Sequence, residues 1–174
     1  MKKLTILLSL SLVGCTGDRA SSHNNSVITW NMDQEDELMA YTKIQIKTYE
    51  NEGYTEVTSG NTHSLVTSDT IRVWVNNAAA YDYLTLHQGM HFPVGTTIIR
   101  VIYGMDNQPK KITASVKAAA NQNPDASDWI FAVADIDGVF MKDNKNHWQF
   151  GALEACNACH VNRLLTDGLF GLQH

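Results

Sequence analysis

The stretch that decides the fold class of this chain is TTIIRVIY, residues 96–103. Six of its eight residues are β-branched, and such side chains favour strands because a helix restricts their rotamers. Upstream, residues 71–75 alternate Ile and Val with Arg and Trp, the period of two that is typical of a strand. Residues 111–116 and 128–136 are further strand-like runs bounded by turn residues. These runs predict a sheet.

Three other stretches are expected to be helical, namely residues 36–50, 76–86 and 152–165. The first contains several β-branched residues, which weaken a helix. The order of strands and helices predicts an α+β fold, mainly an antiparallel β-sheet with a few short helices around it. A length of 174 residues suits one domain with a real core, and hardly two.

The N-terminus has the pattern of an export signal. A positive start at residues 1–3 precedes an apolar run, residues 4–13, that is too short to span a bilayer. The run ends Leu12-Val13-Gly14-Cys15, which resembles the lipobox of bacterial lipoproteins, where the Cys becomes the lipidated first residue of the mature chain. A plain signal peptide with a chance Cys is the alternative.

These features predict three parts: a lipoprotein signal peptide at 1–14, a flexible tether at 15–28 and a single domain at 29–174. Cys15 is the expected lipidation site. A lipid anchor tethers a domain to a membrane without crossing it. Because Thr16, not Asp, follows Cys15, nothing marks retention at the inner membrane. The expected location is the bacterial periplasm, with the anchor in the outer membrane.

The charge balance argues against nucleic acid as a partner. The whole chain has a net charge of −5, and loss of Lys2 and Lys3 with the signal peptide would leave 11 basic against 18 acidic residues. Such a surface repels phosphates, and no basic cluster offsets it.

The most specific motif is Cys156-Asn157-Ala158-Cys159-His160, the spacing of c-type haem attachment. Two thiols about one helical turn apart can reach the two vinyl groups on one edge of a porphyrin. The adjacent His then offers its imidazole to the iron as the proximal ligand. We therefore expect one covalent haem c held by Cys156 and Cys159, with His160 as axial ligand.

Three other interpretations of this motif compete with haem attachment. A structural zinc site needs four ligands, but the mature chain has only these two thiols besides Cys15, and adding His147 would give an unusual spacing. A thioredoxin-like pair expects a βαβ pattern, which the sequence lacks. A plain disulfide of an exported protein stays open. The His that directly follows the second Cys favours haem.

The position of the motif narrows the kind of haem protein. Only fourteen residues follow His160, and none is Met. A small electron-transfer cytochrome c has its motif near the start and a Met ligand far downstream, so that arrangement cannot be built here. The sixth iron position is then filled from upstream or left open. The four-helix cytochromes c′ also have a C-terminal motif, but the β-branched runs contradict an all-helical fold.

A family resemblance covers roughly residues 53–170, in matching order. It rests on residues 53–54 (GY), His63, residues 71–76 (IRVWVN), 92–99 (FPVGTTII), 114–117 (ASVK), 128–131 (DWIF), 155–160 (ACNACH) and 166–170 (TDGLF). These residues resemble the cytochrome P-460 family, which includes the β-rich cytochromes c′-beta. The resemblance implies a large antiparallel sheet with helices, often in a homodimer, and a five-coordinate haem near the C-terminus.

Members of that family oxidise hydroxylamine or bind nitric oxide. The P-460 type cross-links a lysine, on the strand after Gly-Thr, to a porphyrin carbon; the matching position here is Arg100. A guanidinium is almost never deprotonated, so Arg100 is a poor nucleophile for that link. The distal acidic residue of hydroxylamine oxidisers matches Thr113, which is not a carboxylate. Both departures weigh against hydroxylamine oxidation.

Under the resemblance, Arg100 and Thr113 are expected to face the haem. Arg100 would bind a propionate or donate a hydrogen bond to an iron-bound ligand; a solvated side chain on an exposed strand is the alternative. Arg72 lies one residue from a distal arginine position of the family, and a slip of one residue would turn it to the other face of its strand.

The remaining candidates are weaker. His87 and His91 have a metal-binding spacing for a helix, but Pro93 argues against a continuing helix and favours surface histidines. Met90 and Met105 are possible axial ligands, though core or surface Met is commoner. Three aromatic residues are expected to pack in the core or against haem: Trp129, Phe131 and Trp148.

The leading hypothesis is a periplasmic monohaem lipoprotein that binds a small nitrogen-containing ligand, such as nitric oxide, at an open iron. A second is an electron carrier with a six-coordinate iron and a periplasmic redox partner. A third is a hydroxylamine oxidase with a cross-link from Lys110, Lys111 or Lys117. Whether the chain is an enzyme stays open; an enzymatic version would be an oxidoreductase acting on hydroxylamine or nitric oxide.

Overall fold

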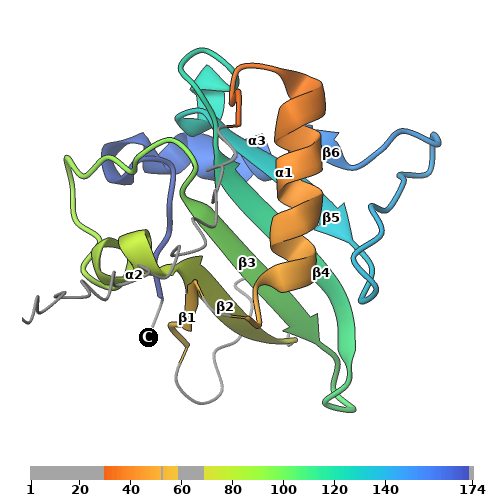
Figure 1. Ribbon diagram of the computed structural model, residues 1–174. Helices are drawn as coiled ribbons and strands as arrows, with labels where there is room; N and C mark the ends of the chain where they lie inside the picture. Colours follow the sequence, from red (N-terminus) through yellow and green to blue (C-terminus); the bar gives the residue numbers. More distant parts are fainter. Residues whose placement is uncertain (1–29, 52, 59–68, 173–174) are drawn as a thin grey trace, which may run out of the picture.

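The computed structural model describes residues 30–51, 53–58 and 69–172 (Figure 1). The predicted signal peptide, the tether with Cys15, and His63 lie outside these residues. The described chain is an antiparallel sheet with short helices, which confirms the α+β prediction. The elements are α1 (Glu35–Thr48), β1 (Tyr54–Glu56), β2 (Thr70–Asn76), α2 (Asn77–Leu84), β3 (Thr97–Tyr103), β4 (Pro109–Lys117), the 3-10 helix η1 (Pro124–Ala126), β5 (Trp129–Ala134), β6 (Phe150–Gly151), α3 (Glu154–His160) and the 3-10 helix η2 (Val161–Thr166).

The sheet is a meander in which the strands lie in sequence order, β1-β2-β3-β4-β5-β6, and each pair is antiparallel. Four of them coincide with the predicted runs. The β-branched run that decided the fold class forms β3, between β2 and β4. The edge strands β1 and β6 were not predicted, because two or three residues carry too little alternation to detect.

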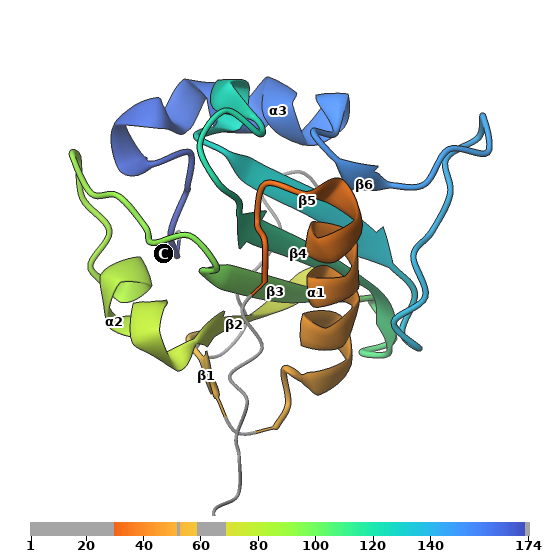
Figure 2. The ribbon, with the colours of Figure 1, turned by 45° about the horizontal axis from the view of Figure 1, so that its top comes forward.

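Helix α1 covers one face of the sheet (Figures 1 and 2). It forms despite its β-branched residues because Leu38, Thr42 and Ile46 share one buried side at helical spacing. The Thr42 hydroxyl donates to the carbonyl oxygen of Leu38, so its polar group is satisfied inside the helix. Tertiary burial therefore overrides a weak local propensity here.

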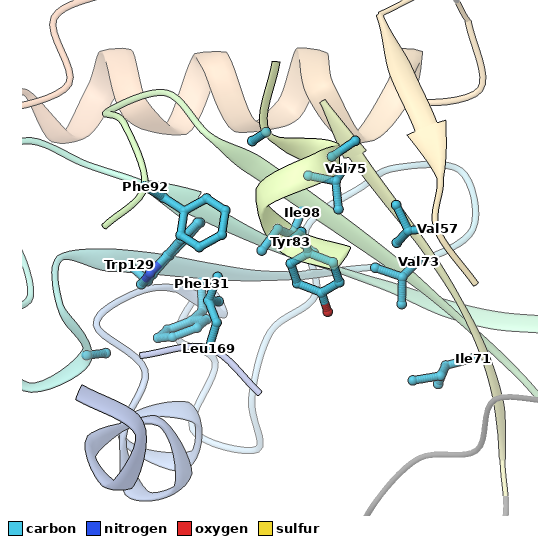
Figure 3. Close-up of a cluster of buried hydrophobic side chains, with 13 residues drawn as sticks. Val57, Ile71, Val73, Val75, Tyr83, Phe92, Ile98, Trp129, Phe131 and Leu169 are labelled. Atoms are coloured by element: carbon cyan, nitrogen blue, oxygen red, sulfur yellow. The ribbon is translucent and has the colours of Figure 1, made fainter. Parts of the chain in front are cut away.

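The opposite face is covered by α2 and by the segment that contains α3 and η2 (Figure 2). The predicted helix at 152–165 is interrupted: α3 ends at His160, and the 3-10 turns of η2 follow with a non-helical φ of −123° at Arg163. Figure 3 shows the buried cluster on this face, where aromatic and aliphatic side chains from the sheet, α2 and the C-terminal segment meet.

Side-chain alternation assigns the residues of each strand to one face or the other. On β3, Ile99 and Val101 pack in the cluster beneath α1, whereas Ile98 and Ile102 pack on the opposite side. Arg100 therefore faces the side covered by α3 and η2. Because the strand period is two, Arg100 lies on the face of β3 opposite to Ile99 and Val101.

Candidate functional site

A cavity lies between the middle of the sheet and α3. The space between its walls is about 610 Å³, including the part that opens to solvent. We call it the α3 cavity. Its lining residues come from β2, β3, β4, β5 and α3: Ile71, Arg100, Ile102, Thr113, Ala114, Ser115, Phe131, Ala132, Val133, Cys156 and His160.

Five of the residues singled out in the sequence meet in this cavity: Arg100, Thr113, Phe131, Cys156 and His160. The exposed Cys159 is not among its lining residues. Cys156 and His160 are 56 and 60 residues away from Arg100 along the chain, so only the fold brings them together. Thr113 pairs directly with Arg100 across β3 and β4. The sequence-predicted site is thus spatially compact.

The two thiols lie one turn apart on α3. Cys156 is half-buried against the cavity, Cys159 is exposed, and both are free. Burial raises the pKa of the Cys156 thiol, and neighbouring Cys159 adds to that shift, while the charge of Arg100 opposes it. Cys156 is therefore a neutral thiol at the cavity wall, not a thiolate poised for redox exchange.

His160 is held in a defined orientation. Its Nδ1 lies 2.5 Å from the carbonyl oxygen of Gly168, so Nδ1 carries the proton and donates. The ring packs against Phe131 at 4.7 Å and edge-on against Phe170 at 5.2 Å between centroids. This arrangement leaves Nε2 as the lone-pair nitrogen, which is the tautomer that an axial iron ligand needs.

The charge state of His160 suits the same role. Burial lowers its pKa; the hydrogen bond to Gly168 opposes that shift and the charge of Arg100 adds to it. A neutral imidazole is the form that binds a metal, and here it is favoured before any metal arrives.

A buried ion pair fixes the carbonyl that orients His160. The Lys117 ammonium lies 2.7 and 2.8 Å from the two carboxylate oxygens of Asp167, which also accept the backbone N–H of Phe92 at 2.8 Å. The indole N–H of Trp129 donates to the Asp167 carbonyl oxygen at 2.6 Å. Gly168 comes next in the chain and supplies the acceptor for His160.

Only a glycine fits at that acceptor position. Gly168 has a φ of +75°, and a Cβ there would lie 2.9 Å from the carbonyl oxygen of Ala126. The segment that holds the His160 acceptor is therefore packed tightly against η1 from one side and anchored by Lys117 from the other.

The attachment motif has a second anchor in an amide pair. The Asn157 and Asn123 side chains exchange two hydrogen bonds of 2.9 Å, and Asn123 also donates to the carbonyl oxygen of Trp129. Asn123 is buried in the loop before β5. Asn157, one of the two residues between the cysteines, thus links α3 through Asn123 to strand β5.

Arg100 supplies the positive charge of the cavity. Its Nε is buried and, among the described residues, has no hydrogen-bond acceptor. Arg72, on the neighbouring strand, points to the other face, where it pairs with Glu56 at 3.4 Å and lies over the ring of Tyr103. In the register of β2 with β3, Arg72 is opposite Val101 and Val73 is opposite Arg100, so Arg72 and Arg100 lie on different faces of the sheet.

Other candidates lie outside the cavity. His87 and His91 are exposed, as expected for surface histidines, and His91 lies at 3.5 Å from Asp167. Met105 is 91% exposed, and Met90 packs at the edge of the cluster around Trp129. Trp129 and Phe131 are buried as predicted.

The prediction for Trp148 is wrong. Its side chain is about half exposed and lies beneath the Lys142 ammonium, in the long loop before β6. The alternation around it is too short to assign a face, so burial of an aromatic was assumed from its type alone.

The lysines considered for a cross-link have other partners or positions. Lys117 is used in the ion pair with Asp167, Lys110 pairs with Asp69 at 3.2 Å, and Lys111 is exposed. None of the three lines the α3 cavity.

Alternative metal chemistry finds no support within residues 30–51, 53–58 and 69–172. No group of three His, Cys, Asp or Glu side chains there could hold a metal ion. His147 lies near Asp143, in the loop before β6, and not near His160.

Sequence reasoning missed Ser115, Asn123 and Asp167. Ser115 could have been found from its period-two relation to Thr113 on the same strand. The burial of Asp167 and Asn123 has no local signal, because their partners are far away in the chain.

The residues present fit a haem c. Two thiols one turn apart, of which Cys156 lines the cavity, a neutral imidazole with Nδ1 engaged and an apolar wall are the groups that would hold such a macrocycle. No family model, curated protein or solved structure matches this chain. In the described ranges, no helix has the length and apolarity to cross a bilayer.

Proposed function

We propose that this chain is an exported, lipid-anchored monohaem c protein that binds a small nitrogen-containing ligand, such as nitric oxide, at an open iron. The observation that carries the proposal is the convergence of Cys156, His160 and Arg100 on one cavity. The resemblance to the cytochrome P-460 family agrees with it, because the fold is the antiparallel sheet with helices that the resemblance implies.

Each residue would have a distinct role. Cys156 and Cys159 would hold the porphyrin through thioether bonds, and His160 would bind the iron through Nε2. The bound haem would supply an iron whose remaining axial position can take a diatomic ligand. The chain's own contribution is to fix the imidazole and to cover the cavity with Ile71, Ile102 and other apolar side chains.

The composition of the cavity wall supports an open sixth position at the iron. Besides Cys156 and His160, the lining residues in the described part of the chain include no His, Met, Lys or Tyr side chain. An electron carrier with a six-coordinate iron needs such a second ligand. The lining of the cavity also weighs against a hydroxylamine oxidase, because it includes none of the three candidate lysines, Lys110, Lys111 and Lys117.

Absorption spectra of the purified protein test this proposal. The protein should be expressed with its own signal sequence in a host that has haem c maturation machinery, and recorded ferric and ferrous, with and without nitric oxide. We expect high-spin five-coordinate spectra that change on addition of the gas. Low-spin spectra in both states, unchanged by nitric oxide, would exclude the open iron, and a strongly red-shifted Soret band would indicate a cross-linked porphyrin. Protein without haem would refute the proposal altogether.

A further inference from the structure

The α3 cavity contains a positive charge that nothing in the described protein neutralises. Arg100 forms no ion pair there, and its buried Nε has no acceptor. Among the residues that the structure describes, no Asp or Glu lines the cavity. A guanidinium stays protonated at any physiological pH, so this charge cannot be removed by deprotonation.

The neighbouring ionisable groups do not act as counter-ions. Burial raises the pKa of both Tyr83 and Cys156, and the charge of Arg100 only partly offsets that shift. Both groups are therefore neutral near pH 7 and offer no negative charge to Arg100. A partly desolvated cation with no counter-ion is costly, which makes an anion the expected occupant.

Two hydroxyls extend this donor surface. Thr113 is directly opposite Arg100 in the pairing of β3 with β4, and Ser115 lies two residues further on the same face of β4. Both line the cavity. Each hydroxyl can rotate to donate to a bound acceptor, so they can supplement the planar fork of Arg100.

We propose that the Arg100, Thr113 and Ser115 surface makes the α3 cavity selective for a small planar anion with two acceptor oxygens, of the nitrite class, over neutral diatomic ligands. This proposal rests on the open iron proposed above and names an anion of the nitrite class, instead of nitric oxide, as the preferred nitrogen-containing ligand. The edge of a guanidinium offers parallel N–H donors that match two oxygens of one anion, a geometry that a neutral diatomic cannot satisfy.

Ligand titrations of the holoprotein test the selectivity. The ferric protein is titrated with nitrite and azide, and the ferrous protein with carbon monoxide, each followed by absorption. Arg100→Gln should weaken nitrite binding by about tenfold or more, the loss expected for a charge-assisted pair, while carbon monoxide binding changes by less than about threefold. Arg100→Lys should retain part of the nitrite affinity, because it keeps the charge but loses the fork.

The matched control is Arg72→Gln, which removes the same charge from the adjacent strand on the opposite face. It should change neither affinity. Thr113→Val and Ser115→Ala should each weaken nitrite binding less than Arg100→Gln does.

A second outcome separates this proposal from a propionate role for Arg100. If the guanidinium binds a carboxylate of the haem, Arg100→Gln will change the affinities of nitrite and carbon monoxide alike and will shift the reduction potential. That result overturns the anion selectivity and leaves the proposed function intact. Absence of covalent haem, measured first by haem staining, would overturn both.

Discussion

The two faces of the sheet are buried in different ways. Under α1, strands β2 to β5 contribute an apolar layer that includes Trp74, Ile99 and Ala132. On the other face, apolar side chains alternate with buried polar groups, of which Lys117, Asp167 and Asn123 are bonded to each other or to backbone, and Arg100 is not. The α1 face also buries polar groups, the hydroxyls of Thr42 and Thr97, but the buried ion pair of Lys117 with Asp167 lies on the other face. Charged groups are the most costly to bury, so this second face is where the chain gives up stability for a site.

The largest expected effect concerns the motif itself. Cys156→Ala combined with Cys159→Ala should abolish covalent haem completely, because no other thiol in the described residues is available. Haem staining after denaturing electrophoresis measures this loss. Circular dichroism should still show the sheet, since the apolar layer beneath α1 does not involve the motif. Retention of covalent haem would contradict the assignment of the site.

Loss of the buried ion pair should come next. Lys117→Met leaves the Asp167 carboxylate buried without its cation, and breaking such a pair costs about 3–5 kcal/mol of unfolding free energy. Urea-induced unfolding of the purified variant measures the change. The control is Lys110→Met, which breaks the more exposed pair with Asp69 and should cost at most about 1 kcal/mol. Equal costs for the two variants would mean that the buried pair of Lys117 with Asp167 stabilises the protein no more than an exposed ion pair does.

The amide pair should have a smaller effect. Asn157→Ala removes the side chain that exchanges two hydrogen bonds with Asn123 and leaves part of a buried amide unsatisfied, a cost of about 1–3 kcal/mol. Asn162→Ala, on the exposed side of the same segment, loses one bond of 3.3 Å and should be close to neutral. Thermal unfolding of both variants in parallel provides the comparison, and a neutral Asn157→Ala would refute the role of the pair.

The smallest effect is expected on the α1 face. Ile99→Val removes one methylene from a fully buried side chain and should cost about 0.5–1.5 kcal/mol. Its haem absorption spectrum should be the same as that of the unsubstituted protein, because Ile99 points away from the α3 cavity. A shifted spectrum would show that the two faces are coupled more tightly than the packing suggests.

The sequence predicted much of this architecture because its signals are local. The β-branched run around Arg100 and the alternation at residues 71–75 each occur within a single strand, and they determined both the strand and its inward face. The attachment motif is likewise contiguous. These are the parts of the site that five to eight adjacent residues specify.

The rest depends on contacts between distant residues. Asp167 meets Lys117 across 50 positions, and Asn123 meets Asn157 across 34. No sequence pattern reveals either pair. Trp148 is the opposite case, because its apolar side chain suggested burial but is about half exposed. The motif itself could be found in the sequence, whereas the groups that hold it in place required the structure.

The meander topology bears on the order in which this protein matures. Each strand pairs with strands adjacent in sequence, so the chain can form its sheet progressively as it emerges, with little loop closure to wait for. The strands that line the α3 cavity are complete when β5 ends at Ala134, well before α3 begins at Glu154. A chain built this way presents its two thiols last, on a helix beside a wall that already exists. Pairing of these strands can therefore precede the formation of α3 and of the segment that contains both thiols.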